Sequence, residues 1–192
     1  MASSVLIGVV YGAVCGYYGG RLDFILMRMA EVVDALPQLV VATLLIMVMG
    51  SGLKSIILAL VIRSWVSTAR LVRSQFYRYR EREFVLAART MGAGDGWLIF
   101  RHIFPSTVGP VITRAMLAVP GAIFSEAFLA YIGLGLQAPE PSIGVLLSDG
   151  QRTLLQYPYQ LLFPAILISL LMAGFNRLGD GLREALDPAG RQ

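Results

Sequence analysis

The sequence predicts an all-α membrane protein, a polytopic helical bundle with about five transmembrane helices in one domain over residues 1–192. Hydrophobic residues make up 56% of the chain, and its mean hydropathy is +0.68. Charged residues make up only 15%, whereas soluble domains average about 25% and use these charges to cover their surface. The apolar residues also gather in long runs, which polar, glycine-rich or proline-containing segments separate. Such runs are typical of helices that cross a bilayer.

The first two predicted spans are irregular. Residues 4–18 are apolar but number about 15, fewer than the roughly 20 that a helix needs to cross a bilayer. Because no basic segment precedes them and no cleavage site follows, we expect a span whose beginning is missing rather than a signal peptide. The second span enters through the mixed segment 24–36 and continues to residue 49. Pro37 should kink it, because proline lacks the amide hydrogen that a helix needs.

Three further spans follow along the chain. The third covers about residues 55–71 and continues as a charged helix to residue 78. The fourth covers about residues 108–134 and the fifth about residues 159–175, after which a short amphipathic tail is expected. The polar segment 135–157 lies between these last two spans and forms the predicted outer loop.

The polar segment 81–105 lies between the third and fourth spans and should form a helix, a glycine turn and a second helix. Phe84, Ala87, Ala88 and Met91 recur at helical spacing and would share one face of the first helix. A helix this short is marginal alone in water, so its apolar face needs a surface that covers it. From periodicity alone, a solvated linker with some helical character stays an alternative.

Glycine residues in this segment predict where the first helix ends. Gly92 and Gly94 can adopt the left-handed conformation that closes a helix C-terminus. Asp95 can cap a second helix that begins near Trp97, and Pro105 marks the entry to the fourth span.

The distribution of lysine and arginine predicts the orientation of the chain. With five spans, thirteen basic residues fall on the side of the 81–105 segment, two fall on the other side, and Arg63 lies inside a span. Cytoplasmic loops carry an excess of Lys and Arg, so this segment is predicted to be cytoplasmic. The same bias accounts for the net charge of +4 without nucleic-acid binding. The two outer residues are Lys54 and Arg152, and the thirteen cytoplasmic ones are Arg21, Arg28, Arg70, Arg73, Arg78, Arg80, Arg82, Arg89, Arg101, Arg114, Arg177, Arg183 and Arg191.

Residue types that support catalysis or metal binding are few. His102 is the only histidine, and a lone histidine near a helix end is usually structural. Cys15 is the only cysteine, so neither a disulfide nor a cysteine-based metal site can form within the chain. The nucleotide-binding pattern G-x-x-x-x-G-K-[ST] is absent. The sequence therefore predicts no catalytic residue, no metal, no cofactor and no ATP hydrolysis by the chain itself.

The 81–105 segment resembles the cytoplasmic loop of permease subunits from binding-protein-dependent ABC importers. That loop carries the pattern E-A-A, a glycine six positions after the Glu, and then I-x-L-P or a close variant. Ala87, Ala88 and Gly92 match this pattern, and the Ile-Phe-Pro of residues 103–105 fits its end. Leu86 stands where the family has Glu, so any contact made by that carboxylate is not expected here.

The resemblance covers nearly the whole chain and points to the C-type partner of a heterodimeric permease in the dipeptide, oligopeptide and nickel group. Ile143 replaces a tryptophan that usually follows Pro-Ser, and the family's N-terminal tail and first span have no counterpart in this sequence. The matching motifs are Gly16–Gly20, Met27–Arg28, Pro37, Ala69–Arg73, Ile132–Leu136 with Pro139, Pro141 and Ser142, and Asn176–Arg183 through Leu186, Asp187 and Pro188.

The resemblance implies the type I ABC importer permease fold, a place in the cell inner membrane, and transport by alternating access rather than catalysis. It also implies several partners besides membrane lipid: a second permease subunit, two ATP-binding cassette subunits and an extracytoplasmic substrate-binding protein. In this family the loop helix docks into a groove on the ATPase subunit and is called the coupling helix. The residues expected to couple to the ATPase are Glu83, Phe84, Leu86, Ala87, Ala88, Met91, Gly92, Ile103 and Pro105.

Arg63 and Glu126 are ionisable residues inside predicted spans. Each lies eight residues from the outer end of its span, which corresponds to a depth of about 12 Å. Charges at such depth are costly and usually face a partner or water. We therefore expect both residues along the translocation pathway, paired with each other or, equally, with the partner permease.

Two other classes of function stay open at this point. One is an ATP-independent channel or membrane scaffold subunit, and the other is an intramembrane enzyme, for which the sequence shows no nucleophile–base pair. Within the transport hypothesis, peptide is favoured over nickel as substrate, because that branch of the family is larger and the sequence offers no metal-binding set.

Overall fold

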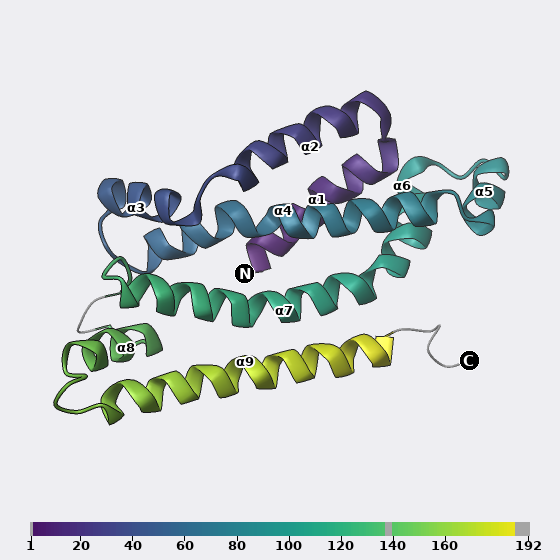
Figure 1. The fold of residues 1–192 in the computed structure, drawn as a ribbon. Helices are drawn as coiled ribbons and strands as arrows, with labels where there is room; N and C mark the ends of the chain where they lie inside the picture. Colours follow the sequence, from purple (N-terminus) through teal and green to yellow (C-terminus); the bar gives the residue numbers. More distant parts are fainter. Residues whose placement is uncertain (1, 137–139, 187–192) are drawn as a thin grey trace. The chain divides into compact units, whose positions relative to one another are not determined.

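Every regular element that the structure describes is a helix (Figure 1). The structure is a computed structural model, and it describes residues 2–136 and 140–186. Pro139, Asp187, Pro188 and Arg191, which entered the predictions above, lie outside these residues. The helices in chain order are α1 (Ala2–Tyr18), α2 (Gly20–Ala35), α3 (Gln38–Met49), α4 (Leu53–Arg80), α5 (Glu83–Thr90), α6 (Asp95–Leu98), the π-helix η1 (Ile99–Ile103), α7 (Phe104–Tyr131), α8 (Ile143–Arg152) and α9 (Tyr159–Leu186).

Three helical stretches among the described residues are long and apolar enough to cross a membrane. They are Leu53–Arg80, Asp95–Tyr131 and Tyr159–Ala185. The pair α2 and α3 makes a fourth candidate if the two helices are counted as one broken span, and α1 is an apolar helix of 17 residues. The prediction of a helical membrane protein is confirmed. The about five predicted spans correspond to these three or four candidates together with the short α1.

The second predicted span is broken rather than kinked. Helix α2 ends at Ala35, α3 begins at Gln38, and the two helices are bent by 77°. Pro37 has an extended backbone with φ of −60° and ψ of 127°. Proline has no amide hydrogen and disfavours helical geometry in the residue before it, so one proline is enough to end α2.

The chain divides into two compact units. Unit 1 comprises Met1–Ala35, Ser64–Ala115 and Asp180–Gln192, and unit 2 comprises Leu36–Arg63 and Met116–Gly179. The long helices α4, α7 and α9 each contribute one part to each unit.

In unit 1, α1 packs against α4 through a ladder of three glycines. Gly8, Gly12 and Gly16 are four residues apart and therefore lie on one face of α1. A Cβ atom placed on them would lie 2.6, 2.4 and 2.7 Å from backbone carbonyl oxygens of α4, too close for any side chain. Small residues at this spacing let two membrane helices approach backbone to backbone.

An ion pair joins α2 to α4 in the same unit. Asp23 is 4% exposed, and its carboxylate accepts hydrogen bonds from Nε and Nη2 of Arg73. The hydroxyl of Tyr77 donates a third bond to it at 2.7 Å. Because a buried carboxylate is costly unless it is paired and hydrogen-bonded, this arrangement specifies which face of α2 meets α4.

Unit 2 contains a helix that the polar composition of segment 135–157 did not predict. Helix α8 occupies Ile143–Arg152, and the Ser142 side chain caps it by accepting a hydrogen bond from the amide of Val145 at 3.1 Å. Gly144 packs against Ala127 and Ala130 of α7. The segment is therefore partly helical and fitted closely to its neighbours.

Candidate functional site

The segment between α4 and α7 forms a helix, a glycine turn and a second helix, as predicted, beside the C-terminal end of α4 (Figure 1). Gly92 has φ of +88°, and its amide donates to the carbonyl oxygen of Arg89 at 3.0 Å. The amide of Ala93 donates to the carbonyl oxygen of Ala88 at 3.1 Å. These two bonds form a Schellman motif, so the predicted role of Gly92 in ending α5 is confirmed. Gly94 has φ of −72° and instead precedes α6.

Helix α5 presents its residues differently from the prediction. Ala88 is only 4% exposed and points inward with the fully buried Val85, whereas Phe84 is 45% and Met91 81% exposed. Ala87 is also exposed. Ala88, which the sequence predicts to dock into an ATPase together with these residues, is therefore buried against the chain itself. Helical spacing shows which residues lie near one another on a helix, but not which edge of that face turns toward the rest of the chain.

The inward residues of the loop complete a hydrophobic core in unit 1. Ile103, predicted to contact an ATPase, is fully buried in this core, whereas Pro105 is exposed in the first turn of α7. Each fully buried large apolar side chain contributes about 1.5–3 kcal/mol, so this packing holds the loop firmly to α1 and α4. The buried members are Val85, Ala88, Leu98 and Ile103 from the loop and its exit, Tyr17 from α1, and Val72 and Phe76 from α4.

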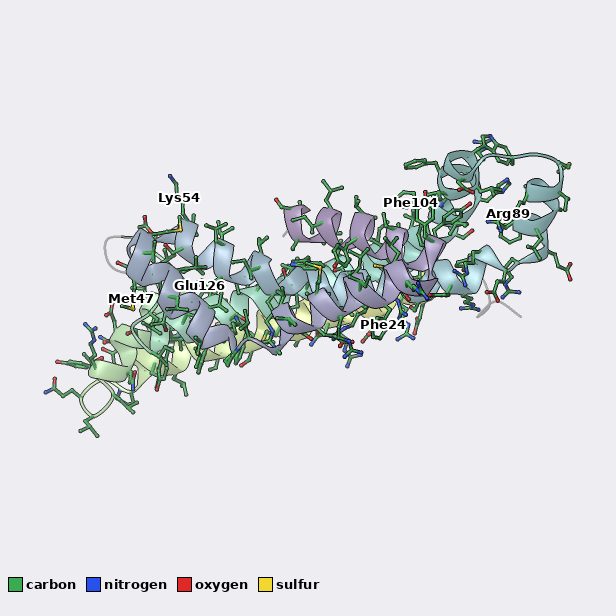
Figure 2. All side chains as sticks on the ribbon, turned by 90° about the horizontal axis from the view of Figure 1, so that it is seen from above. Phe24, Met47, Lys54, Arg89, Phe104 and Glu126 are labelled. Carbon is green, nitrogen blue, oxygen red and sulfur yellow. The ribbon has the colours of Figure 1, made fainter. Side chains whose placement is uncertain are left out.

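Polar contacts add a second attachment between the loop and α1. The Tyr17 hydroxyl donates to Oδ1 of Asp95 in α6 at 2.5 Å and accepts a hydrogen bond from Nη2 of Arg89 in α5 at 3.2 Å. The Arg89 guanidinium also lies over the Tyr17 ring, 5.9 Å from its centroid. Figure 2 shows Arg89 on the loop. One tyrosine side chain thus contacts both helices of the loop.

Asp95 does not cap α6 in the way the sequence suggested. Gly94 occupies the N-cap position without a side-chain hydrogen bond, and Asp95 is the first residue of the helix. Its carboxylate instead accepts a hydrogen bond from the hydroxyl of Tyr17, which lies 78 residues earlier in the chain. A carboxylate in the first turn still interacts favourably with the helix dipole, so Asp95 can serve α6 and α1 together.

Five large apolar side chains of the loop remain exposed, and we call them the loop patch. His102 lies beside two of them, with its ring centroid 6.0 Å from that of Phe84 and 4.6 Å from that of Trp97. Its Nε2 atom is buried and has no hydrogen-bond partner among the described residues. Exposed large apolar side chains mark interaction sites where they lie close together, as Phe84 and Trp97 do around His102. The loop patch consists of Phe84, Leu86, Met91, Trp97 and Phe100, which are 45%, 46%, 81%, 52% and 75% exposed.

The remaining predicted loop residues lie at the surface. Glu83 is exposed in the first turn of α5, where a negative charge favours the helix dipole. Gly92 is exposed at the turn, and a Cβ atom placed on it would meet no atom within 4 Å. Its requirement for glycine therefore comes from its backbone conformation and not from crowding.

Arg63 and Glu126 both lie in unit 2 and are half-buried. Ile56 and Ala59 near the start of α4 share a core cluster with Leu129 near the end of α7, so these two helix parts run antiparallel. Figure 2 shows Glu126 in the same region as Lys54, the second residue of α4. Oε1 of Glu126 is buried and has no hydrogen-bond partner within the described part of the chain. The pairing of Glu126 with Arg63 stays a prediction.

The described residues offer no group of three or more His, Cys, Asp or Glu side chains that could hold a metal ion. Cys15 is fully buried as a free thiol. It belongs to a small core cluster with Met27 and Ala69.

Tyr17 is the residue whose position the sequence did not reveal. It lies in the glycine- and tyrosine-rich motif at the end of α1, to which no role was assigned. Its hydroxyl partners lie 72 and 78 residues further along the chain. No local periodicity or spacing connects residues that far apart, so only the folded structure brings them together.

Comparison with known proteins identifies relatives over nearly the whole chain. Residues 8–192 match the family described as "Binding-protein-dependent transport system inner membrane component". The chain is 47% identical over 184 residues to the oligopeptide transport system permease protein OppC of Bacillus subtilis, an alignment that covers 96% of this chain and 60% of that protein. It is 50% identical over 184 residues to the dipeptide transport system permease protein DppC of the same organism, covering 95% of this chain and 58% of that protein.

A relative from a second bacterium shows the same pattern. The chain is 42% identical over 188 residues to the oligopeptide transport system permease protein OppC of Haemophilus influenzae, with 98% of this chain and 60% of that protein covered. The chain therefore spans only 58% to 60% of the length of these relatives.

Proposed function

The chain belongs to the family of binding-protein-dependent transport system inner membrane components, and we propose that it works as the permease subunit of an ATP-driven importer. It forms one half of a translocation pathway through the inner membrane, and a second permease subunit forms the other half. Two ATP-binding cassette subunits hydrolyse ATP, and an extracytoplasmic binding protein delivers the substrate. The spans then alternate between states that open to either side of the membrane.

We propose peptides as the substrates. The support is the 47% and 50% identity to permeases named for oligopeptide and dipeptide transport. The test is uptake of radiolabelled dipeptides, oligopeptides and nickel by a host that lacks its own peptide importers and expresses the complete transporter. Peptide uptake that requires an active ATPase is expected. Uptake of nickel without uptake of peptides would show that nickel is the substrate. Uptake that persists without the ATPase would favour a channel.

The observation that carries the coupling role is the loop patch on a firmly packed loop. Helix α5 has 8 residues, which is too few for a stable helix in water, and the unit 1 core stabilises it from one side. Phe84 and Met91, which lie beside the inward residues Val85 and Ala88, remain exposed. An ATPase groove that covers them would move α5 as a rigid body, and the left-handed turn at Gly92 would hold the angle between α5 and α6.

A matched pair of substitutions tests this docking surface. Met91→Asp puts a charge on an exposed residue of the loop patch, and Leu155→Asp puts the same charge on a leucine of unit 2 that is 99% exposed. We expect Met91→Asp to lower co-purification of the ATPase subunits about tenfold, because a charge in a covered apolar contact is left without water. Leu155→Asp should leave co-purification unchanged. Equal co-purification and equal uptake for both variants would refute the docking surface.

Arg63 and Glu126 are proposed to line the translocation pathway. The support is their shared position in unit 2 and the buried Glu126 Oε1 without a hydrogen-bond partner among the described residues. If the two side chains pair in the transporter, Arg63→Glu should abolish uptake and Arg63→Glu with Glu126→Arg should restore it. If the double variant is as inactive as the single one, each residue instead faces the partner permease or water.

A further inference from the structure

Tyr17 joins the end of α1 to both helices of the loop. Its side chain is 7% exposed and belongs to the unit 1 core beside Val72, Phe76 and Val85. Its hydroxyl bridges a carboxylate of α6, from Asp95, and a guanidinium of α5. The loop is thus attached to α1 at one oxygen atom as well as by packing.

The backbone around Tyr17 is also held in place. Nη1 of Arg80, the last residue of α4, donates to the carbonyl oxygens of Gly16 and Tyr17 at 3.2 and 3.3 Å. These carbonyls lie in the last turn of α1, where helix carbonyls have no partner within the helix. The C-terminal end of α1 is therefore tied to α4 through its backbone and to the loop through one side chain.

The polar bonds to Tyr17 fix direction in a way that the apolar core does not. Apolar contacts are non-directional, so the packing holds the loop against α1 without defining a donor–acceptor direction between them. Hydrogen bonds depend on the angle at the donor, and bonds to charged groups are stronger than neutral ones. The bonds to Arg89 and Asp95 therefore add a directional constraint on the position of α1 relative to the loop.

A backbone turn begins two residues after Tyr17, at Gly19. Gly19 and Gly20 both have positive φ, +65° and +59°, and connect α1 to α2. A Cβ atom on Gly19 would lie 2.7 Å from Nη1 of Arg80, whereas one on Gly20 would meet no atom within 4 Å. Two successive residues in the left-handed region make a sharp turn that only glycine adopts easily. A displacement of Tyr17 would act first on this turn.

We infer that Tyr17 is the positioning residue that transmits movement of the loop to α1. The inference rests on the proposed function, because it assumes that the ATPase moves the loop. Movement of α5 and α6 pulls on the Tyr17 hydroxyl through Arg89 and Asp95, and α1 follows. Without the hydroxyl, the loop still packs and still docks, but the hydrogen bonds that fix its orientation relative to α1 are lost.

The first experiment removes the hydroxyl and keeps the ring. The complete transporter is reconstituted in liposomes with Tyr17→Phe, and peptide uptake is measured per ATP hydrolysed. The matched control is Tyr18→Phe, because Tyr18 is its neighbour, is 58% exposed and contacts Tyr17 only through the ring. We expect Tyr17→Phe to retain the ATPase subunits and to lower uptake per ATP about tenfold, the size of a charge-assisted hydrogen bond. Tyr18→Phe should behave as the wild type.

The second experiment addresses the same bond from the other side. Asp95→Asn keeps an acceptor oxygen for Tyr17, whereas Asp95→Ala removes it. We expect uptake per ATP to fall only slightly in Asp95→Asn and about tenfold in Asp95→Ala. Tyr17→Phe combined with Asp95→Ala should be no worse than Tyr17→Phe alone, because loss of the hydroxyl already removes the bond to Asp95. The comparison of Asp95→Asn with Asp95→Ala stands even if Tyr17→Phe fails to assemble.

The outcomes separate this inference from the proposed function. If the wild-type transporter shows no ATP-dependent peptide uptake, the proposed function fails. If the wild type is active and Tyr17→Phe couples normally, or if Tyr17→Phe and Tyr18→Phe lose uptake equally, only the role of Tyr17 is overturned. If the losses of uptake per ATP in Tyr17→Phe and Asp95→Ala add up in the double variant, the role of Tyr17 is contradicted as well.

Discussion

Helices α5 and α8 are both too short to be stable alone, yet they are stabilised in opposite ways. Helix α5 has 8 residues, an N-cap, Arg82, without a side-chain hydrogen bond, and two inward side chains in the core of unit 1. Helix α8 has 10 residues, and Ser142 caps it. It meets its neighbours through Gly144 and Gly150, where an added Cβ would lie 2.5 Å from Ala130 and 2.6 Å from the carbonyl oxygen of Gln160.

The difference shows what each helix leaves free. Val85 and Ala88 anchor α5 to the core, whereas the large apolar side chains of Phe84 and Leu86 remain exposed. Because α8 is stabilised by a local cap and by backbone contact, it depends little on distant side chains. We infer that α5 is built to be moved together with the loop, whereas α8 is built to remain in place against α7 and α9 within unit 2.

The largest expected effect comes from the inward side of α5. Val85→Asp places a charge where the side chain is fully buried. The control is Leu86→Asp at the next residue, whose side chain is 46% exposed. An unpaired buried charge costs about 3–5 kcal/mol, so we expect Val85→Asp to unfold the loop. Leu86→Asp should change the unfolding free energy by less than about 0.5 kcal/mol. Proteolysis of the detergent-purified protein between α4 and α7 measures both effects, and equal protection of the two variants would contradict the side-chain anchoring of α5.

A smaller effect is expected from the backbone contact of α8. Gly144→Val would place side-chain atoms against Ala127 and Ala130, and such overpacking costs about 1–3 kcal/mol. Gly174→Val is the matched control, because no atom lies within 4 Å of a Cβ at Gly174, which is in α9. Thermal unfolding in detergent should separate the two variants. If both have the wild-type midpoint, α8 is not held by close backbone packing.

Much of α5 and little of α8 could be predicted from the sequence. The end of α5 at Gly92 could be predicted, because glycine tolerates the left-handed conformation, and Gly92 has φ of +88°. The same reasoning failed for Gly94, which has φ of −72°. The break after α2 follows from Pro37. These helix ends depend on the local backbone preferences of glycine and proline, which are the same whatever the rest of the chain does.

The orientation of α5 and the existence of α8 could not be predicted, for a different reason. Ala88 turns inward because Tyr17, Val72 and Phe76 are there to meet it, and these residues lie on two other helices. Helix α8 has glycines where a helix pattern would show apolar side chains, because its contacts are between backbones. Contacts between segments far apart in the chain decide both features, and the spacing of residues along the sequence does not show which segments will meet.

The glycine turn gives a prediction of intermediate size. Gly92→Ala puts a Cβ on a residue with positive φ, which costs about 1–2 kcal/mol even though no atom crowds it. Gly96→Ala, four residues later in α6, also meets no atom, and there alanine should be neutral or stabilising by up to about 1 kcal/mol. The two substitutions therefore have opposite expected signs in a measurement of unfolding free energy. A stabilising Gly92→Ala would mean that the turn is not left-handed.

The smallest effect on stability, and the sharpest comparison of the two regions, comes from single cysteines on each. Thr90 in α5 and Gln151 in α8 are both exposed, so Thr90→Cys and Gln151→Cys should each change the unfolding free energy by less than about 0.5 kcal/mol. The native Cys15 is fully buried and gives little background labelling. The thirteen-to-two distribution of basic residues predicts that the loop is cytoplasmic and that α8 is outside. An impermeant thiol reagent added to intact cells should therefore label Gln151→Cys at once and Thr90→Cys only after the membrane is opened. Labelling of Thr90→Cys in intact cells would mean that the loop lies outside the cell. A cytoplasmic ATPase could then not reach the loop patch.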